Sequence, residues 1–289
     1  MNYAEGITKV DRKQLAAKTS VIGLASKIIS ILFNFISRYF FVRYLGAEIL
    51  GLEGVIKDCV SLLALTDIGI DVAMTYRLYA VVNSQDYKKI NDYLTVYQFA
   101  YRMVMIVIAI LGIVGAMILR YTINGVSLHW PFIYAAYIIQ IVSVEASYFI
   151  AYKRTFLNAD QKKHIQIIVD TAVGVIANMI KIYFIVFHHS YLGYLCTIIL
   201  QNIVSNYCLN YYIKEYYPKI KLQRKVDKSL VRELFSDTRH ILGNKIAGFV
   251  YSSTDNFLVS FFLGTSLVGI LSNYKMVFST LSSLLIGFT

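Results

Sequence analysis

The chain has 289 residues, of which 57% are hydrophobic and only 16% are charged, and its formal net charge is +11. A mean hydropathy of +0.57 and only two prolines exclude a disordered, collagen-like or Pro-rich linker protein. Apolar runs of about 20 residues recur along the chain, and a helix of that length crosses roughly 30 Å of hydrocarbon. The sequence therefore predicts a polytopic membrane protein.

The predicted fold class is an all-α bundle of transmembrane helices. The apolar runs are continuous and lack the alternation of apolar and polar residues found in outer-membrane strands, which favours helices. The second run continues as an amphipathic segment to Val82, so we expect a break near Asp67–Asp71 or a helix that protrudes into the cytoplasm. In chain order, the predicted spans are 19–45, 49–71, 94–119, 131–152, 165–187, 191–213, 241–263 and 266–289.

The distribution of Lys and Arg predicts the orientation of these spans. The connections 46–48, 120–130, 188–190 and 264–265 contain a single basic residue, Arg120. Since basic loops stay in the cytoplasm, we expect a cytoplasmic N-terminus. Positive charge placed between apolar runs also argues against a nucleic-acid partner. The opposite connections contain eighteen basic residues: Lys9, Arg12, Lys13, Lys18, Lys88, Lys89, Lys153, Arg154, Lys162, Lys163, Lys214, Lys219, Lys221, Arg224, Lys225, Lys228, Arg232 and Arg239.

An internal repeat appears when the chain is aligned with itself at an offset of 218 residues. The repeat unit spans six helices, so both copies share one orientation, as in the parallel repeats of secondary transporters. We therefore expect a cytoplasmic segment 1–18, a six-helix lobe 19–213, a basic linker 214–240 and the first two helices of a second lobe, 241–289. The chain ends inside an apolar run, which predicts an N-terminal fragment of a longer protein. The aligned pairs are Lys27 with Lys245, Leu45-Gly46 with Leu263-Gly264, Gly51 with Gly269, Lys57 with Lys275, and Ser61 with Ser279.

Several predicted spans carry basic side chains. Ionisable groups inside a membrane are costly and by default face a bundle interior or a watery cavity. The first span has a polar stripe at helical spacing from Lys27 to Arg38, and such cations around a cavity would attract a phosphate or pyrophosphate. Alternatively, they snorkel to the interface or pair with Glu53, Asp58 or Asp170. The candidate substrate-binding residues are Arg38, Lys57, Lys27, Lys181, Lys245, Lys275 and Asn34.

Three acidic residues, Asp170, Glu145 and Asp67, are candidates for coupling transport to H⁺ or Na⁺, although Asp170 could instead pair with a basic neighbour. No metal site is predicted, because the three cysteines lie in apolar runs and His188-His189 has no obvious third ligand. The chain also lacks a phosphate-binding Gly-Lys-Ser/Thr loop, a His-Glu-x-x-His motif and a nucleophile elbow. We therefore expect no cofactor and no enzymatic activity.

Four segments resemble a known family. They are RYFFVRYLGAEILGL at 38–52, LTDIGI at 65–70, YRLY at 76–79 and DYKKI at 86–90. Together they are similar to the first-hairpin signature and the following short cytoplasmic loop of Wzx-type polysaccharide and O-antigen flippases, in the multidrug/oligosaccharidyl-lipid/polysaccharide exporter superfamily.

The resemblance implies two six-helix lobes in a V around a central cavity. It also implies a location in the bacterial cytoplasmic (inner) membrane and an activity by alternating access. That activity would move undecaprenyl-pyrophosphate-linked oligosaccharide units from the cytoplasmic to the outer leaflet for capsule, O-antigen or exopolysaccharide synthesis. Membrane lipids, a coupling ion and polysaccharide-assembly proteins would be the partners. A full member would carry at least twelve spans, more than the eight predicted here.

Two other function classes stay open. One is another transporter of the superfamily, either a peptidoglycan lipid flippase or a drug/cation antiporter, although an antiporter would favour acidic cavity residues over the basic ones found here. The other is a membrane enzyme such as a polysaccharide polymerase or a lipid-linked glycosyltransferase, which would need a large external loop or a cytoplasmic catalytic domain. A non-transporting scaffold would have little use for charge in so many spans.

Overall fold

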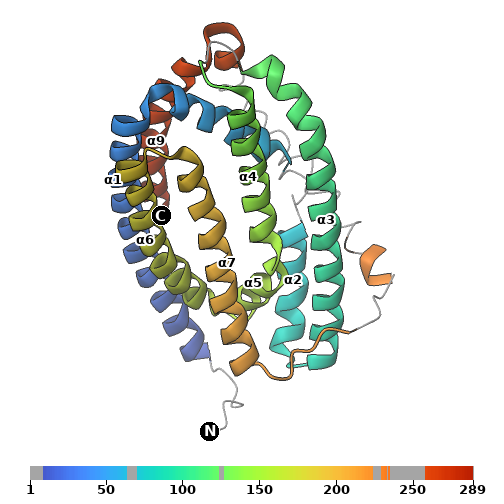
Figure 1. Cartoon of the computed structure of the whole chain (residues 1–289). Helices are drawn as coiled ribbons and strands as arrows, with labels where there is room; N and C mark the ends of the chain where they lie inside the picture. Colours follow the sequence, from blue (N-terminus) through green and yellow to red (C-terminus); the bar gives the residue numbers. More distant parts are fainter. Residues whose placement is uncertain are drawn as a thin grey trace.

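The computed structural model describes residues 9–63, 70–123, 127–223, 229–232, 234 and 258–288, and in these ranges the chain forms helices without strands (Figure 1). The predicted all-α helical bundle is therefore confirmed. The helices are α1 (Lys9–Leu63), α2 (Ile70–Asn83), α3 (Tyr87–Thr122), α4 (Trp130–Tyr148), α5 (Ala151–Ala159), α6 (Lys163–His188), α7 (Tyr191–Tyr216) and α9 (Thr265–Phe288).

Helix α1 is a hairpin of two helices that meet at Gly46. Gly46 has φ 82° and ψ 172°, a left-handed conformation that favours glycine and breaks the helix. A guanidinium nitrogen of Arg38 lies 3.6 Å from a carboxylate oxygen of Glu53, although 15 residues of straight helix would separate them by about 22 Å. The chain therefore reverses direction at Gly46, between the predicted spans 19–45 and 49–71.

The bundle has one end with few charges, which we call the low-charge end. Here the rings of Tyr44 and His189 lie 5.4 Å apart, and the carboxylate of Glu48 accepts a hydrogen bond from the hydroxyl of Ser127 at 3.0 Å. The connections after the first, third and fifth predicted spans therefore lie together, as the alternation of spans requires.

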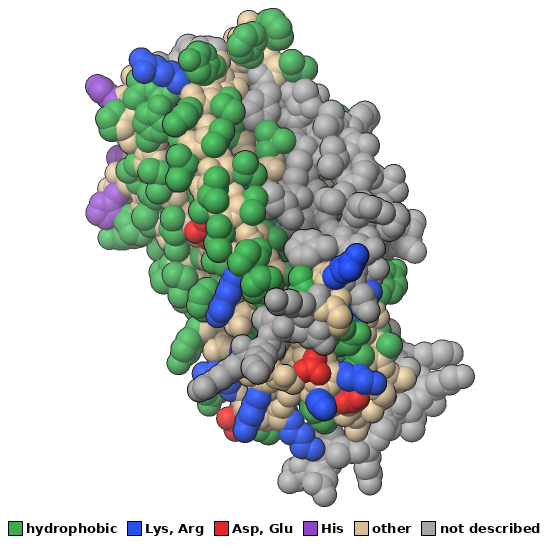
Figure 2. All heavy atoms as spheres, turned by 90° about the vertical axis from the view of Figure 1, so that its right-hand side faces the viewer, with side chains coloured by type: hydrophobic (Ala, Val, Ile, Leu, Met, Phe, Trp, Pro, Cys, Tyr) green, Lys and Arg blue, Asp and Glu red, His purple; other side chains and the backbone are tan. Residues whose placement is uncertain are grey.

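The opposite, basic end holds the other set of connections. Asn91 donates to the backbone oxygen of Lys219 at 3.1 Å, and Lys162 donates to the hydroxyl of Tyr217 at 2.5 Å. Burial, and next the neighbouring carboxylate of Asp160, raise the pKa of Tyr217, so its hydroxyl stays protonated and donates to Asp160. Figure 2 shows hydrophobic side chains over the upper and middle parts of one face, with most Lys, Arg, Asp and Glu at the lower end.

Four described helices are long and apolar enough to cross a membrane, or five if the bent pair α4–α5 counts as one span. Helices α3, α6, α7 and α9 coincide with predicted spans, whereas 241–263 lies outside the described residues except for a helical stretch at 258–263. The predicted break at Asp67–Asp71 lies partly in the undescribed residues 64–69, and α2 follows from Ile70.

The fourth predicted span, 131–152, extends past the end of α4 into the first residues of α5. Helix α4 ends at Tyr148, and α5 begins at Ala151 with its axis turned by 42°. Lys153 and Arg154, predicted to begin a cytoplasmic loop, are therefore helical residues of α5. The bend contains neither Pro nor Gly, the residues that usually announce one in a sequence.

Candidate functional site

A cavity of about 420 Å³ lies between the two halves of α1 and the helices α6, α7 and α9. Its volume falls within the range of small-molecule sites. Glu53 lies seven residues beyond Gly46, and Lys275 eleven residues beyond Gly264, or about 10 and 16 Å along their helices. The cavity therefore lies near the middle of the bundle. It is lined by Asn34, Ser37, Arg38, Phe41, Leu50, Glu53, Gly54, Lys57, Asp58, Asn178, Lys181, Tyr194, Ser272, Lys275 and Met276.

Glu53 organises the polar wall of this cavity. Its side chain is only 3% exposed, and one carboxylate oxygen accepts from the ammonium of Lys57 at 2.7 Å and from the hydroxyl of Tyr194 at 3.1 Å. The other oxygen lies 3.6 Å from Arg38. A carboxylate buried to this extent is stable only with such partners. Glu53 thus holds one side chain from each half of α1 and one from α7 around the cavity.

Arg38 connects α1 to α9. Its Nε donates to the amide oxygen of Asn273 at 2.7 Å, and one terminal nitrogen donates to the hydroxyl of Ser272 at 2.5 Å. The side chain remains 20% exposed while making these contacts. Because Arg38 spans the gap between the first and last described helices, its contacts couple the two sides of the cavity.

The described lining is more basic than acidic. Lys57 remains 52% exposed beside Glu53, and Lys181 donates to the amide oxygen of Gln201 at 3.0 Å while its ammonium lies 5.8 Å from the ring centroid of Tyr194. Low-dielectric walls strengthen the field of such charges. The described lining therefore carries a positive excess that suits an anion: Arg38, Lys57, Lys181 and Lys275 against Glu53 and Asp58.

The two aligned segments of the repeat have matching geometry. Gly46 and Gly264, which align at the 218-residue offset, both have positive φ, 82° and 96°. A Cβ built on Gly51 would lie 1.9 Å from the backbone oxygen of Thr265, and one on Gly269 only 3.0 Å from the backbone nitrogen of Gly51. Equivalent residues that face each other in this way are what a two-fold relation between parallel repeats produces.

The structure brings five of the seven candidate binding residues to one cavity. Lys27 is half-buried on α1 but does not line the cavity, and Lys245 lies outside the described residues. The cavity and pairing alternatives are both present, because Arg38 and Lys57 line the cavity and contact Glu53. Sequence reasoning did not place Glu53, Tyr194 or Ser272 in the site. The spacing of Glu53 and Lys57, four residues apart on one helix, was the available signal. The five are Asn34, Arg38, Lys57, Lys181 and Lys275.

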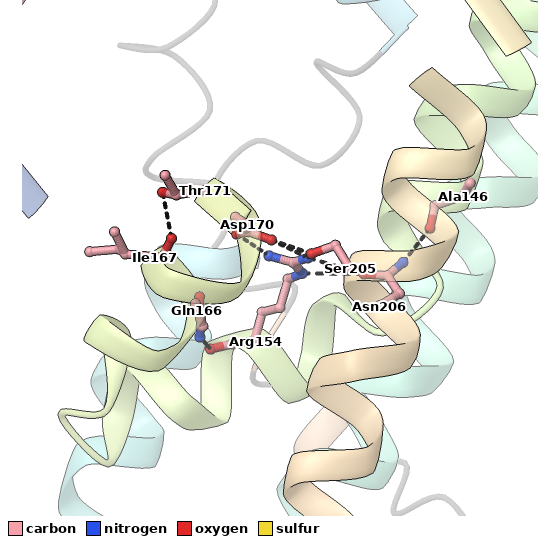
Figure 3. A network of polar contacts seen from close by, with 8 residues as sticks. All are labelled: Ala146, Arg154, Gln166, Ile167, Asp170, Thr171, Ser205 and Asn206. Carbon is pink, nitrogen blue, oxygen red and sulfur yellow. Dashed lines mark hydrogen bonds and ion pairs between the residues drawn. The ribbon is translucent and has the colours of Figure 1, made fainter. Parts of the chain in front are cut away.

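Asp170, a candidate for ion coupling, belongs to a separate polar network shown in Figure 3. Its two carboxylate oxygens accept from two guanidinium nitrogens of Arg154 at 2.8 and 3.1 Å, and the hydroxyl of Ser205 also donates to it. Arg154 further donates to Asn206, whose amide donates to the backbone oxygen of Ala146 at 2.6 Å. The network ties α4, α5, α6 and α7 together.

Glu145, another acidic candidate, is not part of this network. Glu145 lies on α4 and has no hydrogen bond or ion pair among the described residues, while Asp67 lies outside them. In the same part of the chain, no group of three His, Cys, Asp or Glu side chains could hold a metal ion.

Comparisons with known proteins identify the family. The family described as "Polysaccharide biosynthesis protein" matches residues 15–289, whereas no curated protein matches the chain significantly. A solved structure described as "protein A" matches 95% of the chain with a TM-score of 0.74 and 11% sequence identity, which shows the fold alone. The chain spans 62% of that structure's length. The chain thus belongs to the polysaccharide biosynthesis family, that of the Wzx-type flippases, whose members are typically multi-pass membrane transporters.

Proposed function

We propose that the protein is a flippase that moves undecaprenyl-diphosphate-linked oligosaccharide units across the bacterial cytoplasmic membrane. The observation that carries the proposal is the basic cavity at mid-depth, shared by α1 and α9. The side chains of Lys57, Lys181 and Lys275 would hold the diphosphate, while the lipid tail stays in the bilayer. The eighteen-to-one distribution of basic residues orients the N-terminus and the basic end toward the cytoplasm.

The transport step would be a rocking movement of two lobes, 19–213 and a second lobe that begins at 241, joined by the linker 214–240. A ligand drives such a change only if it binds the two states with different affinity. Arg38 supplies a candidate for that difference, because its hydrogen bonds to Ser272 and Asn273 cross from one lobe to the other. A diphosphate that competes for the guanidinium would weaken these bonds. The cytoplasmic membrane lipids and polysaccharide-assembly proteins would be the further partners.

The charge of the cavity also separates this proposal from a drug/cation antiporter. A site for organic cations needs an acidic or aromatic lining, because a positive potential repels the ligand. Here the acidic Glu53 already contacts two cations, Arg38 and Lys57. The described lining therefore offers more cationic than anionic groups to a ligand.

Charge reversal in the cavity tests the proposal. In the full-length protein we expect Arg38→Glu and Lys57→Glu to lower surface polysaccharide at least about tenfold, because a carboxylate repels the diphosphate over a few ångströms of poorly screening surroundings. Export of polymer to the cell surface is the measurement, with the amount of protein in the membrane fraction as the check on insertion. The matched control is Lys89→Glu, at an exposed position of α3. Normal polymer output from both cavity variants would count against the assignment.

We further propose that the Asp170 carboxylate has a structural role rather than a coupling role, because Arg154 and Ser205 already occupy both oxygens. Asp170→Asn should therefore lower the free energy of unfolding by about 1 kcal/mol, a small value since the side chain is 44% exposed. The H⁺ and Na⁺ dependence of transport should stay unchanged. A flattened dependence on either ion would instead make Asp170 the coupling residue.

A further inference from the structure

A second cavity, of about 350 Å³, lies between α3, the bend that joins α4 to α5, and α7. The described residues that line it all differ from those that line the first cavity. Tyrosines line it from three sides, Tyr101 on α3, Tyr148 at the end of α4 and Tyr152 on α5, and Arg102 contributes a cation. The bend opens this space, because the turn of the axis after Tyr148 leads α5 away from the line of α4.

The position of Arg102 along α3 places this cavity at a membrane surface. Arg102 and Arg120 are 18 residues apart, about 27 Å along the helix, and no charged residue lies between them. That distance nearly equals the thickness of the hydrocarbon layer. Arg120 lies at the low-charge end, with its guanidinium 5.9 Å from the ring centroid of Trp130. We therefore expect Arg102 at the level of the lipid phosphates on the side of the basic end.

The cavity offers a cation and several hydrogen-bond donors to a ligand. Arg102 is exposed, and among the described residues it forms no ion pair. The Lys153 ammonium donates a hydrogen bond to the amide oxygen of Asn210 at 2.5 Å. The amide hydrogens of Asn210 therefore remain for another acceptor. Gln98 donates to the hydroxyl of Tyr152 at 3.3 Å, so the Tyr152 hydrogen is also available. No Asp or Glu is part of the described lining. A guanidinium and available amide and hydroxyl hydrogens, with Lys153 adjacent and no carboxylate in the described lining, favour an anion.

We propose that this cavity binds the headgroup of an anionic phospholipid from the leaflet at the basic end. The phosphate contacts Arg102 and accepts hydrogen bonds from Asn210 and Tyr152, and the tyrosine rings pack against the glycerol and the first acyl carbons. Basic pockets between membrane helices on the cytoplasmic side bind anionic headgroups in this way. The site is independent of the transport cavity, and the bound lipid would stabilise the bend by joining α3, α5 and α7.

The test uses the full-length protein purified in an uncharged detergent. Native mass spectrometry measures binding of phosphatidylglycerol, with phosphatidylcholine as the neutral lipid and inorganic phosphate as the free anion. We expect selective binding of phosphatidylglycerol, and a loss of affinity of about tenfold or more in Arg102→Gln, because a charge-assisted hydrogen bond is removed. Arg120→Gln, at the opposite end of α3, is the matched control and should bind as the wild type does. Tyr152→Phe, which removes one oxygen atom, should weaken binding by a few-fold.

Three results would overturn the proposal. One is equal affinity of wild-type protein and Arg102→Gln for phosphatidylglycerol, and another is equal binding of phosphatidylcholine. The third is Arg102-dependent binding of inorganic phosphate alone or of a polyisoprenyl diphosphate in preference to phosphatidylglycerol. If Arg102→Gln fails to fold, unchanged affinity in Tyr152→Phe contradicts the proposal equally. None of these binding measurements depends on polysaccharide export. A negative result for the lipid site is therefore distinguishable from a negative result for the proposed flippase activity.

Discussion

Replacing Gly51 with alanine is expected to destabilise the protein by about 1–3 kcal/mol and to impair polysaccharide export. The new Cβ would lie 1.9 Å from the backbone oxygen of Thr265, and a backbone atom cannot move aside as a side chain can. The second half of α1 and α9 must therefore separate. In a membrane, no hydrophobic force drives two helices together. Small residues at their interface let the backbones approach closely, and this close packing stabilises the pair. Thermal unfolding in detergent measures the loss.

The chain supplies two comparisons for this variant. Gly23→Ala, in the first half of α1, is the matched control, because its Cβ would meet nothing closer than Ile167 Cδ1 at 3.9 Å. Alanine favours a helix by about 0.5–1 kcal/mol over glycine, so this control should be as stable as the wild type or more stable. Gly269→Ala, whose Cβ would lie 2.4 Å from the backbone oxygen of Ala47, should reproduce the defect of Gly51→Ala. Wild-type stability in both Gly51→Ala and Gly269→Ala would show that the close contact is not needed.

Much of the site could be predicted because membrane burial makes charge rare and therefore informative. Arg38, Lys57 and Lys275 are conspicuous in apolar runs, and the 218-residue offset aligns Lys57 with Lys275. The same offset aligns Gly46 with Gly264, whose positive φ values depend on glycine having no Cβ. Intramembrane charges and repeated glycines could thus be predicted, because both are recognised from residue type and spacing alone.

The features that could not be predicted depend on contacts between helices. The central position of Glu53 requires the reversal at Gly46, which brings Arg38 back beside it, and the arrival of Tyr194 from a distant helix. The α4–α5 bend is invisible because Phe149 and Ile150 are as apolar as the span they interrupt. Arg154 was consequently assigned to a loop, although it reaches Asp170 from a helix.

The central claim is that Lys57 and Lys275 face one water-filled site that receives a lipid diphosphate. Cysteine substitution at each position tests it in the full-length protein. A water-soluble maleimide should label both Lys57→Cys and Lys275→Cys, since both positions line the cavity. Cys196 is exposed, so the variants are made in a protein in which every cysteine, including Cys59, Cys196 and Cys208, is replaced by serine.

The decisive measurement is the labelling rate of these two variants with and without a polyisoprenyl diphosphate. We predict that the lipid diphosphate slows labelling at both positions, by about tenfold at roughly ten times its dissociation constant, as mass action requires. A polyisoprenyl alcohol, which lacks the diphosphate, should give no protection. A cysteine replacing Lys89, outside the cavity, should label equally in all conditions. Absence of labelling at both cavity positions, or equal labelling with and without the diphosphate, would contradict the assignment of this cavity as the substrate site.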